Sequence, residues 1–395
     1  MTGIKPMDSP TKRRTRSRRG WAVCSTMVVG AMTLAGCSTV DKPAGEEGGG
    51  GAPGAGTIVS SSASDAKIKE MWGGKTLNVG FSPPILSEFY TQIEKSAFNR
   101  MKEYEDRYGV KWKWERQGAL NDAHSGTETL GIVQGYIARK FNAVFVCSAA
   151  NAATMQQLYA QGTKQGVHFY QFNSTEELAN PSQANDPTGG LNTISNIGYD
   201  DRWQSGYLAG QYIAKQLKGK GTVIQILGPS GSDWTKLRQK GFETAIAEYP
   251  GLKIAAAADG GYVRDKGLAA AQDLLVKYPD VDAVYGENED MALGASQAID
   301  ARGLKHWDGS SGIITIGADG LVSGMEAIKA GKLTATVNVN SIEMGRMMVD
   351  TLVAHEVLGE AVSQFIRIPT VVVDKSNVTW NESIIKEAMA AKAKY

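Results

Sequence analysis

Short apolar runs and amphipathic helical patterns alternate along this chain from residue 76 to residue 377, and this alternation restricts the fold more than any other feature. Apolar residues such as Phe89, Ile93, Ala97 and Met101 recur at helical spacing between the runs. Strands that alternate with helices predict an α/β protein, with doubly wound parallel sheets and helices on both faces. The runs predicted to be strands are Leu77 to Phe81, Ala143 to Cys147, His168 to Phe172, Thr222 to Leu227, Ala283 to Tyr285 and Ile313 to Ile316.

Such sheets bind ligands beyond the carboxyl ends of their strands. The polar and aromatic residues that directly follow each predicted strand are therefore the first candidates for a functional site.

Residues 1–37 resemble the export signal of a lipoprotein. Seven Lys and Arg residues precede an apolar run from Trp21 to Leu34, and Leu34-Ala35-Gly36-Cys37 then places small residues before a cysteine. We expect cleavage before Cys37 and a lipid on its sulfur, which would anchor the exported protein to the outer face of the cell membrane. An uncleaved membrane anchor is the alternative, although the apolar run is short for a spanning helix. Ser17-Arg18-Arg19 loosely resembles a twin-arginine signal, so the export route stays open.

Without residues 1–37 the chain holds 35 basic and 40 acidic residues, a net charge of −5. A mildly acidic chain argues against nucleic acid as a partner. Cys147 would be the only cysteine left, so no disulfide within the chain is expected. Its apolar surroundings indicate a buried structural thiol rather than a nucleophile. Residues 38–72 begin with a Gly- and Ser-rich stretch and are predicted to be a flexible tether.

Four segments after predicted strands carry a more specific signal. They are Gly228-Pro229-Ser230-Gly231 followed by Arg238 to Phe242, then Tyr285 to Ala295, Ile316 to Gly320 and Gly331 to Thr336. In this order they resemble the ribose- and galactose-type sugar-binding receptors of ABC importers, the type I periplasmic binding proteins. The resemblance implies two doubly wound lobes joined by a three-crossing hinge, with a ligand cleft between them.

The same likeness implies the boundaries of the lobes. The first lobe would comprise residues 75–199 and 341–368, and the second would comprise residues 200–340 and 369–380. Residues 381–395 would form a C-terminal helix.

The resemblance also implies the ligand-binding residues. It assigns Phe89, Tyr90 and Asn173 to the first lobe, Arg238, Tyr262, Asn288 and Asp319 to the second, and Asn338 to the hinge. Trp234 joins them because it precedes Arg238 by one helical turn and shares its face. Two positions depart from the ribose receptors: Asn173-Ser174 replaces their Asp-Arg pair, and Val339 replaces their hinge Gln.

Structural alternatives remain for several of these residues. Arg238 could be a surface arginine on an amphipathic helix. Asp319 could cap a helix that begins at Leu321, and Asn288 could cap the helix that follows it. The aromatic candidates could belong to the core.

Catalysis finds little support in the sequence. The four histidines are scattered, and neither a Gly-x-Ser-x-Gly nucleophile elbow nor the ligand spacing of a metal site occurs. Glu287, Glu289 and Asp290 form an acidic trio that could bind a cation, although a solvated loop at the strand end is the prediction that we favour.

The sequence therefore predicts a monomeric, lipid-anchored solute-binding receptor without a cofactor, which delivers a neutral sugar or sugar alcohol to an ABC permease. A sensor that presents its ligand to a membrane receptor is the alternative, and an exported hydrolase is a weaker one. Asn and Ser can each donate and accept, which suits the hydroxyls of an open-chain polyol. We expect alditols to be favoured and D-ribose to be disfavoured.

Overall fold

The computed structural model describes residues 64–119, 125–148, 150, 152–173, 192–199, 202–390 and 394–395. The predicted export signal, the predicted lipid-bearing Cys37 and Ser174 lie outside the described residues. Within the described part of the chain, no helix is both long enough and apolar enough to cross a membrane.

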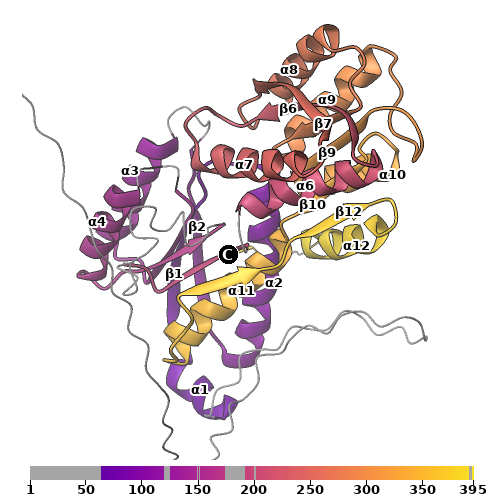
Figure 1. The fold of residues 1–395 in the computed structure, drawn as a ribbon. Coiled ribbons are helices and arrows are strands. Elements are labelled where there is room, and N and C mark those ends of the chain that lie inside the picture. Colours follow the sequence, from indigo (N-terminus) through magenta and orange to yellow (C-terminus); the bar gives the residue numbers. More distant parts are fainter. Residues whose placement is uncertain are drawn as a thin grey trace, which may run out of the picture. The chain divides into compact units, whose positions relative to one another are not determined.

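Six parallel strands form the first sheet, in the order β11-β5-β4-β3-β1-β2. We call this sheet and its helices the first lobe. Its helices α2 (Glu88–Tyr108) and α11 (Ser341–Leu352) lie side by side although they are far apart in the sequence, as Figure 1 shows. Helices α3 (Ser125–Ala138) and α4 (Ala152–Thr163) form a second pair. The strands are β1 (Thr76–Ser82), β2 (Lys111–Arg116), β3 (Ala143–Val146), β4 (His168–Phe172), β5 (Ser195–Tyr199) and β11 (Phe365–Ile368).

The second sheet also has six strands, in the order β12-β10-β9-β8-β6-β7, and only β12 runs antiparallel to its neighbour. This sheet and its helices are the second lobe. Its strands are β6 (Lys220–Leu227), β7 (Gly251–Asp259), β8 (Ala283–Gly286), β9 (Ile314–Asp319), β10 (Ala335–Asn338) and β12 (Val371–Asp374). Its helices are α6 (Arg202–Gln216), α7 (Asp233–Ala247), α8 (Arg264–Lys277), α9 (Glu289–Ala301) and α10 (Val322–Lys329).

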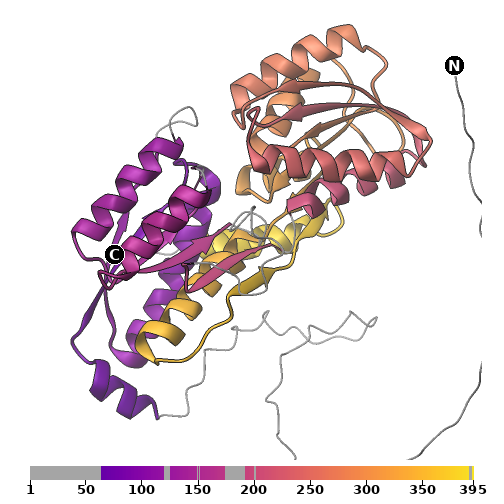
Figure 2. The same cartoon turned by 60° about the vertical axis from the view of Figure 1, so that its left-hand side comes forward.

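Each sheet separates two apolar cores, because the side chains of a strand point alternately to its two faces. In β4, Phe169 belongs to the core beneath α3 and α4, whereas Tyr170 and Phe172 belong to the core beneath α2 and α11. In the second lobe, α6 and α7 pack together, as do α8 and α9, and each pair has its own core cluster. Figure 2 shows these helices around the second sheet from another side. The predicted doubly wound α/β fold is confirmed.

Both sheets share one topology. Numbered within each sheet, the strand order is 2-1-3-4-5-6 in both, so the order reverses between β1 and β3 and again between β6 and β8. Ligands of such sheets bind at this reversal, beyond the carboxyl ends of the strands. The chain passes between the sheets after β5, after β10 and after β11, where the resemblance placed the three crossings.

Two predicted boundaries are wrong. Residues 65–72, assigned to the tether, form helix α1 (Asp65–Trp72), in which the Ser64 side chain accepts a hydrogen bond from the Lys67 N–H at 3.3 Å. Asp65 also pairs with Arg107 of α2 at 2.8 Å, which holds the short helix against the first lobe. The C-terminal helix α12 (Val378–Met389) begins before residue 381 and ends before residue 395. Its Ile385 and Ala388 pack with α10 in one core cluster.

Candidate functional site

Arg238 occupies the carboxyl end of the second sheet and is almost completely buried. It lies on α7, the helix that follows β6, and 5% of its surface is exposed. One terminal nitrogen donates to the Glu287 carbonyl at 2.5 Å, and the other contacts Asp319 Oδ1 at 3.3 Å. Arg238 is therefore not a surface arginine, and the structural alternative for it is wrong.

Asp319 is the last residue of β9 and has a φ of 138°, a strained value for a residue with a side chain. Burial raises the pKa of its carboxyl to about 6, and the neighbouring Arg238 opposes part of that rise. The carboxyl is therefore mostly ionised at neutral pH. Asp319 does not cap a helix, because the N-cap of α10 is Leu321.

The acidic trio was predicted to be solvated, and for two of its members this is wrong. Glu287 and Glu289 are both fully buried, whereas Asp290 is partly exposed and pairs with Arg264 at 2.7 Å. Glu287 Oε2 accepts from the Gly228 N–H at 2.7 Å. Burial raises the pKa of Glu287 to about 8, so this carboxyl is largely protonated at neutral pH. It adds a neutral hydrogen-bonding group beside Arg238 that sequence reasoning missed.

Tyr262 lies in the loop before α8 with a left-handed φ of 58°. Its hydroxyl accepts from Thr235 at 3.1 Å and donates to Glu287 Oε2 at 3.5 Å. Asn288 caps α9, because its Oδ1 accepts from the Met291 N–H at 2.9 Å and its Nδ2 donates to the Tyr262 carbonyl at 3.2 Å. The capping alternative for Asn288 is confirmed, and its role is to hold the Tyr262 loop.

The first-lobe candidates form a second group. Phe89 and Tyr90 open α2 after β1, with their ring centroids 5.2 Å apart, and Asn173 follows β4. Asn173 Nδ2 donates to the Tyr90 hydroxyl at 3.2 Å, and that hydroxyl lies 3.6 Å from the Cys147 sulfur. Cys147 is 2% exposed, as its sequence predicted.

Tyr199 connects the two groups, and sequence reasoning missed it. It ends β5 in the first lobe, is 1% exposed, and accepts a hydrogen bond from Arg238 Nη2 at 3.4 Å. Trp234 of α7 packs against the first-lobe core that contains Tyr199. Asn338 lies at the hinge, where its Oδ1 accepts a hydrogen bond from the Asn340 N–H at 2.8 Å. This oxygen therefore already has a partner within the chain.

Several buried polar atoms at these strand ends have no hydrogen-bond partner among the described residues. They include Ser82 Oγ at the last residue of β1, Asn173 Oδ1 directly after β4, Arg238 Nε, Tyr285 OH and Glu287 Oε1. Buried polar groups are nearly always hydrogen-bonded, so such a set needs an explanation. All of them lie at or near the carboxyl ends of strands, where doubly wound sheets bind ligands. These unpaired groups include donors and acceptors, so they suit a ligand that offers both.

The family model for a periplasmic binding protein domain matches residues 79–361. The chain belongs to this family. The family consists of binding proteins rather than enzymes, which removes the hydrolase alternative.

Named relatives agree with this assignment. The ribose import binding protein RbsB of Escherichia coli is 32% identical over 214 residues, which cover 51% of this chain and 69% of that protein. A xylitol-binding protein of Mycolicibacterium smegmatis is 31% identical over 150 residues, which cover 37% of this chain and 41% of that protein. For several other curated relatives, the matched stretch spans about half of their length.

The solved structure of an ABC transporter solute binding protein from Bacillus halodurans, with bound myo-inositol, has a TM-score of 0.65 and 25% identity. That match covers 79% of this chain and 99% of the other. A solute binding protein from Mycobacterium smegmatis with bound glycerol has a TM-score of 0.62 and 26% identity, and covers 78% of this chain and 96% of the other.

Proposed function

We propose that this protein is the extracytoplasmic solute-binding receptor of an ABC importer and that it captures a neutral sugar or sugar alcohol. The observation that carries the proposal is the set of unpartnered buried polar atoms at the strand ends, next to the aromatic rings of Phe89, Tyr90 and Tyr262. Sugars and polyols offer hydroxyls to such atoms and apolar C–H faces to such rings.

The charges of the site favour a neutral ligand. Arg238 and Asp319 lie 3.3 Å apart and balance one another. Glu287 holds its proton at neutral pH because burial raises its pKa to about 8. A neutral carboxyl can both donate and accept a hydrogen bond, so it can bind a ligand hydroxyl that acts as an acceptor or as a donor. An anionic or cationic solute would leave an unpaired charge in this buried setting, which is costly.

The first-lobe side of the site bears on the choice among neutral solutes. Asn173 Nδ2 is bound to Tyr90, and its Oδ1 is a free acceptor among the described residues. A single neutral acceptor constrains a ligand less than a charged Asp-Arg pair would. We therefore favour alditols, as in the xylitol-binding relative, over the ribose of the Escherichia coli relative.

A thermal-shift panel of xylitol, ribitol, arabinitol, myo-inositol, D-ribose, amino acids and short peptides on the purified protein tests the ligand class. A true ligand at about a hundred times its dissociation constant adds about 2.7 kcal/mol to the free energy of unfolding. We expect the largest shift with an alditol. A larger shift with ribose would contradict the preference, and shifts only with amino acids or peptides would contradict the proposed function.

Arg238→Ala and Asp319→Ala test the site. Each should weaken the binding of the identified solute by about 1.5–3 kcal/mol, or roughly ten- to a hundredfold, because a charged hydrogen bond is lost in a buried setting. Arg139→Ala is the matched control, since Arg139 is exposed and pairs with Glu115 of the first lobe. Calorimetry on folded variants that bind like the parent would remove Arg238 and Asp319 from the site.

The anchor is a separate part of the proposal, supported by Leu34-Ala35-Gly36-Cys37. Cys37→Ala should abolish lipid attachment, and it should block processing or release the protein from the membrane. Radiolabelled fatty acid incorporation and membrane fractionation measure both effects. Normal processing with unchanged membrane retention would contradict the lipid anchor.

A further inference from the structure

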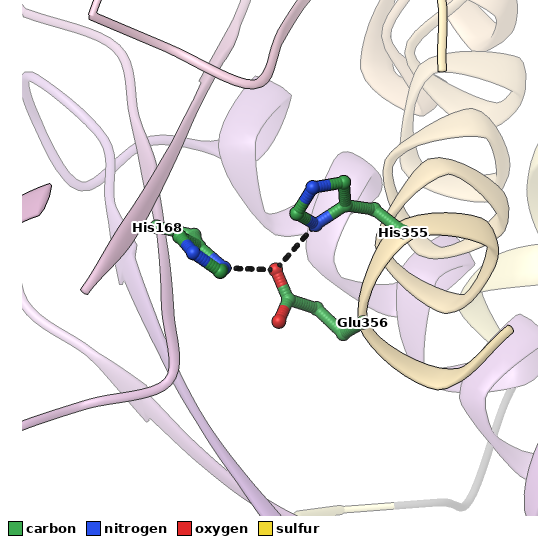
Figure 3. A group of neighbouring side chains, drawn as sticks. All are labelled: His168, His355 and Glu356. Atoms are coloured by element: carbon green, nitrogen blue, oxygen red, sulfur yellow. Dashed lines mark hydrogen bonds and ion pairs between the residues drawn. The ribbon is translucent and has the colours of Figure 1, made fainter. Parts of the chain in front are cut away.

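His168, His355 and Glu356 meet in the first lobe, as Figure 3 shows. His168 Nδ1 lies 2.7 Å from Glu356 Oε1, and His355 Nδ1 lies 2.9 Å from the same oxygen. The three possible ligand atoms all lie within 4.8 Å of one another. We call these three residues the His-His-Glu cluster.

The fold assembles this cluster from segments that are far apart in the sequence. His168 is the first residue of β4 and points to the same face as Tyr170, two residues later. His355 and Glu356 lie in the π-helical turn η2 (Val353–Val357), which continues α11. Single π-helical turns inside helices are rare and occur frequently at functional sites. Because the histidines come from separate elements, the search for metal-ligand spacing in the sequence could not find them.

We propose that the His-His-Glu cluster binds a divalent transition-metal ion, Zn²⁺, with a water molecule as the fourth ligand. Two imidazole nitrogens and one carboxylate oxygen form the set of three protein ligands that zinc uses where a fourth position stays open. The side chains of His168, His355 and Glu356 are 34%, 26% and 11% exposed, so solvent reaches the cluster and can supply the water.

The distances allow zinc after a small adjustment. Ligands bound to zinc at about 2.0–2.1 Å in a tetrahedron lie about 3.3 Å apart. The observed 2.7 and 2.9 Å are hydrogen-bond distances, so side-chain movement of roughly half an ångström would open the space for the ion. The two side chains that must move are partly exposed histidines, which can adjust without a change of the sheet.

Tyr170 provides the outer support that protein metal sites usually have. Its hydroxyl donates to Glu356 Oε1 at 2.7 Å and lies 3.1 Å from His355 Nδ1. Outer hydrogen bonds of this kind orient a ligating carboxylate. The two nitrogen ligands disfavour Ca²⁺ and Mg²⁺, which take oxygen ligands.

Direct binding to the whole protein tests the proposal. The chelator-treated wild-type chain should take up one equivalent of Zn²⁺ in equilibrium dialysis and none of Mg²⁺ or Ca²⁺. Co²⁺ in its place should show the visible absorption of a tetrahedral site. The absence of Zn²⁺ uptake by folded wild-type protein would overturn the proposal, and so would an octahedral cobalt spectrum.

Variants locate the metal. Tyr170→Phe removes an outer partner and should weaken Zn²⁺ binding about ten- to hundredfold. His168→Gln and His355→Gln each remove a ligand, so each should weaken Zn²⁺ binding by more than that. His306→Gln is the matched control, because His306 also pairs with a carboxylate, Asp300 at 2.9 Å, but belongs to no cluster of three ligands among the described residues.

Equal zinc binding by His355→Gln and His306→Gln would place the metal elsewhere and overturn the assignment. Circular dichroism of each variant checks that it is folded, and the measurement on the wild-type chain does not depend on any variant. Solute binding is measured separately at Arg238, so failure of the zinc site and failure of the proposed receptor function are distinguishable.

Discussion

Replacing Glu289 by glutamine should change how the stability of this protein depends on pH. Glu289 opens α9 and is fully buried. Its Oε2 accepts from the Gly320 N–H at 2.7 Å, from the Leu321 N–H at 2.9 Å and from the Thr336 hydroxyl at 3.0 Å. Burial nevertheless raises the pKa of this carboxyl to about 8, from an ordinary value of 4.5.

The sign of the effect follows from the two pKa values. Between about pH 4.5 and pH 8 the folded protein keeps the Glu289 proton, whereas the unfolded chain loses it. Unfolding then releases a proton, so the free energy of unfolding falls as the pH rises through this window. At about 1.4 kcal/mol for each pH unit, the loss reaches at most about 5 kcal/mol above pH 8. Below about pH 4.5 both the folded and the unfolded chain hold the proton, so Glu289 no longer lowers the free energy of unfolding.

Glu289→Gln keeps one oxygen for the three donors and cannot ionise. The variant should resemble the parent at about pH 5 and should exceed it by a few kcal/mol at about pH 9. Urea unfolding at several pH values measures the difference. Glu326→Gln on the exposed face of α10 is the control and should keep the slope of the parent. Stability curves of the parent and of Glu289→Gln that run parallel across this range would refute the reasoning.

Two further changes have clear outcomes. Gly228→Ala would place a Cβ 2.2 Å from Cζ of Tyr262 and displace that ring. Solute binding measured by calorimetry should therefore weaken. Unchanged affinity would show that solute binding does not depend on the position of this ring. Asp350→Ala would remove the carboxylate that lies 2.5 and 3.0 Å from two nitrogens of the buried Arg100, and should cost about 1.5–3 kcal/mol in urea unfolding because Glu103 still pairs with this arginine. A loss below about 1 kcal/mol would mean that water replaces the carboxylate.

Seven of the strands were predictable because each has a local signal, whereas β5, β7, β10, β11 and β12 were not among the predicted runs. All six apolar runs became strands. Trp112 and Trp114 alternate with Lys111 and Lys113 in the sequence, and this stretch forms β2, whose exposed lysines lie at a sheet edge. Helix α1 also had a local signal in Ser64 and Asp65, which cap its first turn, but the neighbouring glycine-rich stretch obscured it.

The site was only partly predictable, because burial of a charged residue depends on segments far away in the sequence. In the sequence, Glu287 and Glu289 have the pattern of an acidic loop. In the structure, their carboxyl groups accept hydrogen bonds from the N–H groups of Gly228 and Gly320, which are distant in the sequence. Arg238 could be placed near the strand ends, but its contact with Tyr199 depends on how β5 of the first lobe meets α7 of the second. No local pattern contains that information.

The passage of the chain between the two sheets has a consequence for its synthesis. The first sheet needs β11, which pairs with β5, and the second needs β12, so the first is incomplete until Ile368 has been synthesised and the second until Asp374. Contacts this distant in sequence form slowly, since a long loop must close first. A nascent chain that contains only residues 1–340 lacks α11 and β11 and would expose the core face of α2. Both sheets can therefore be completed only long after the proposed export signal in residues 1–37 has been synthesised.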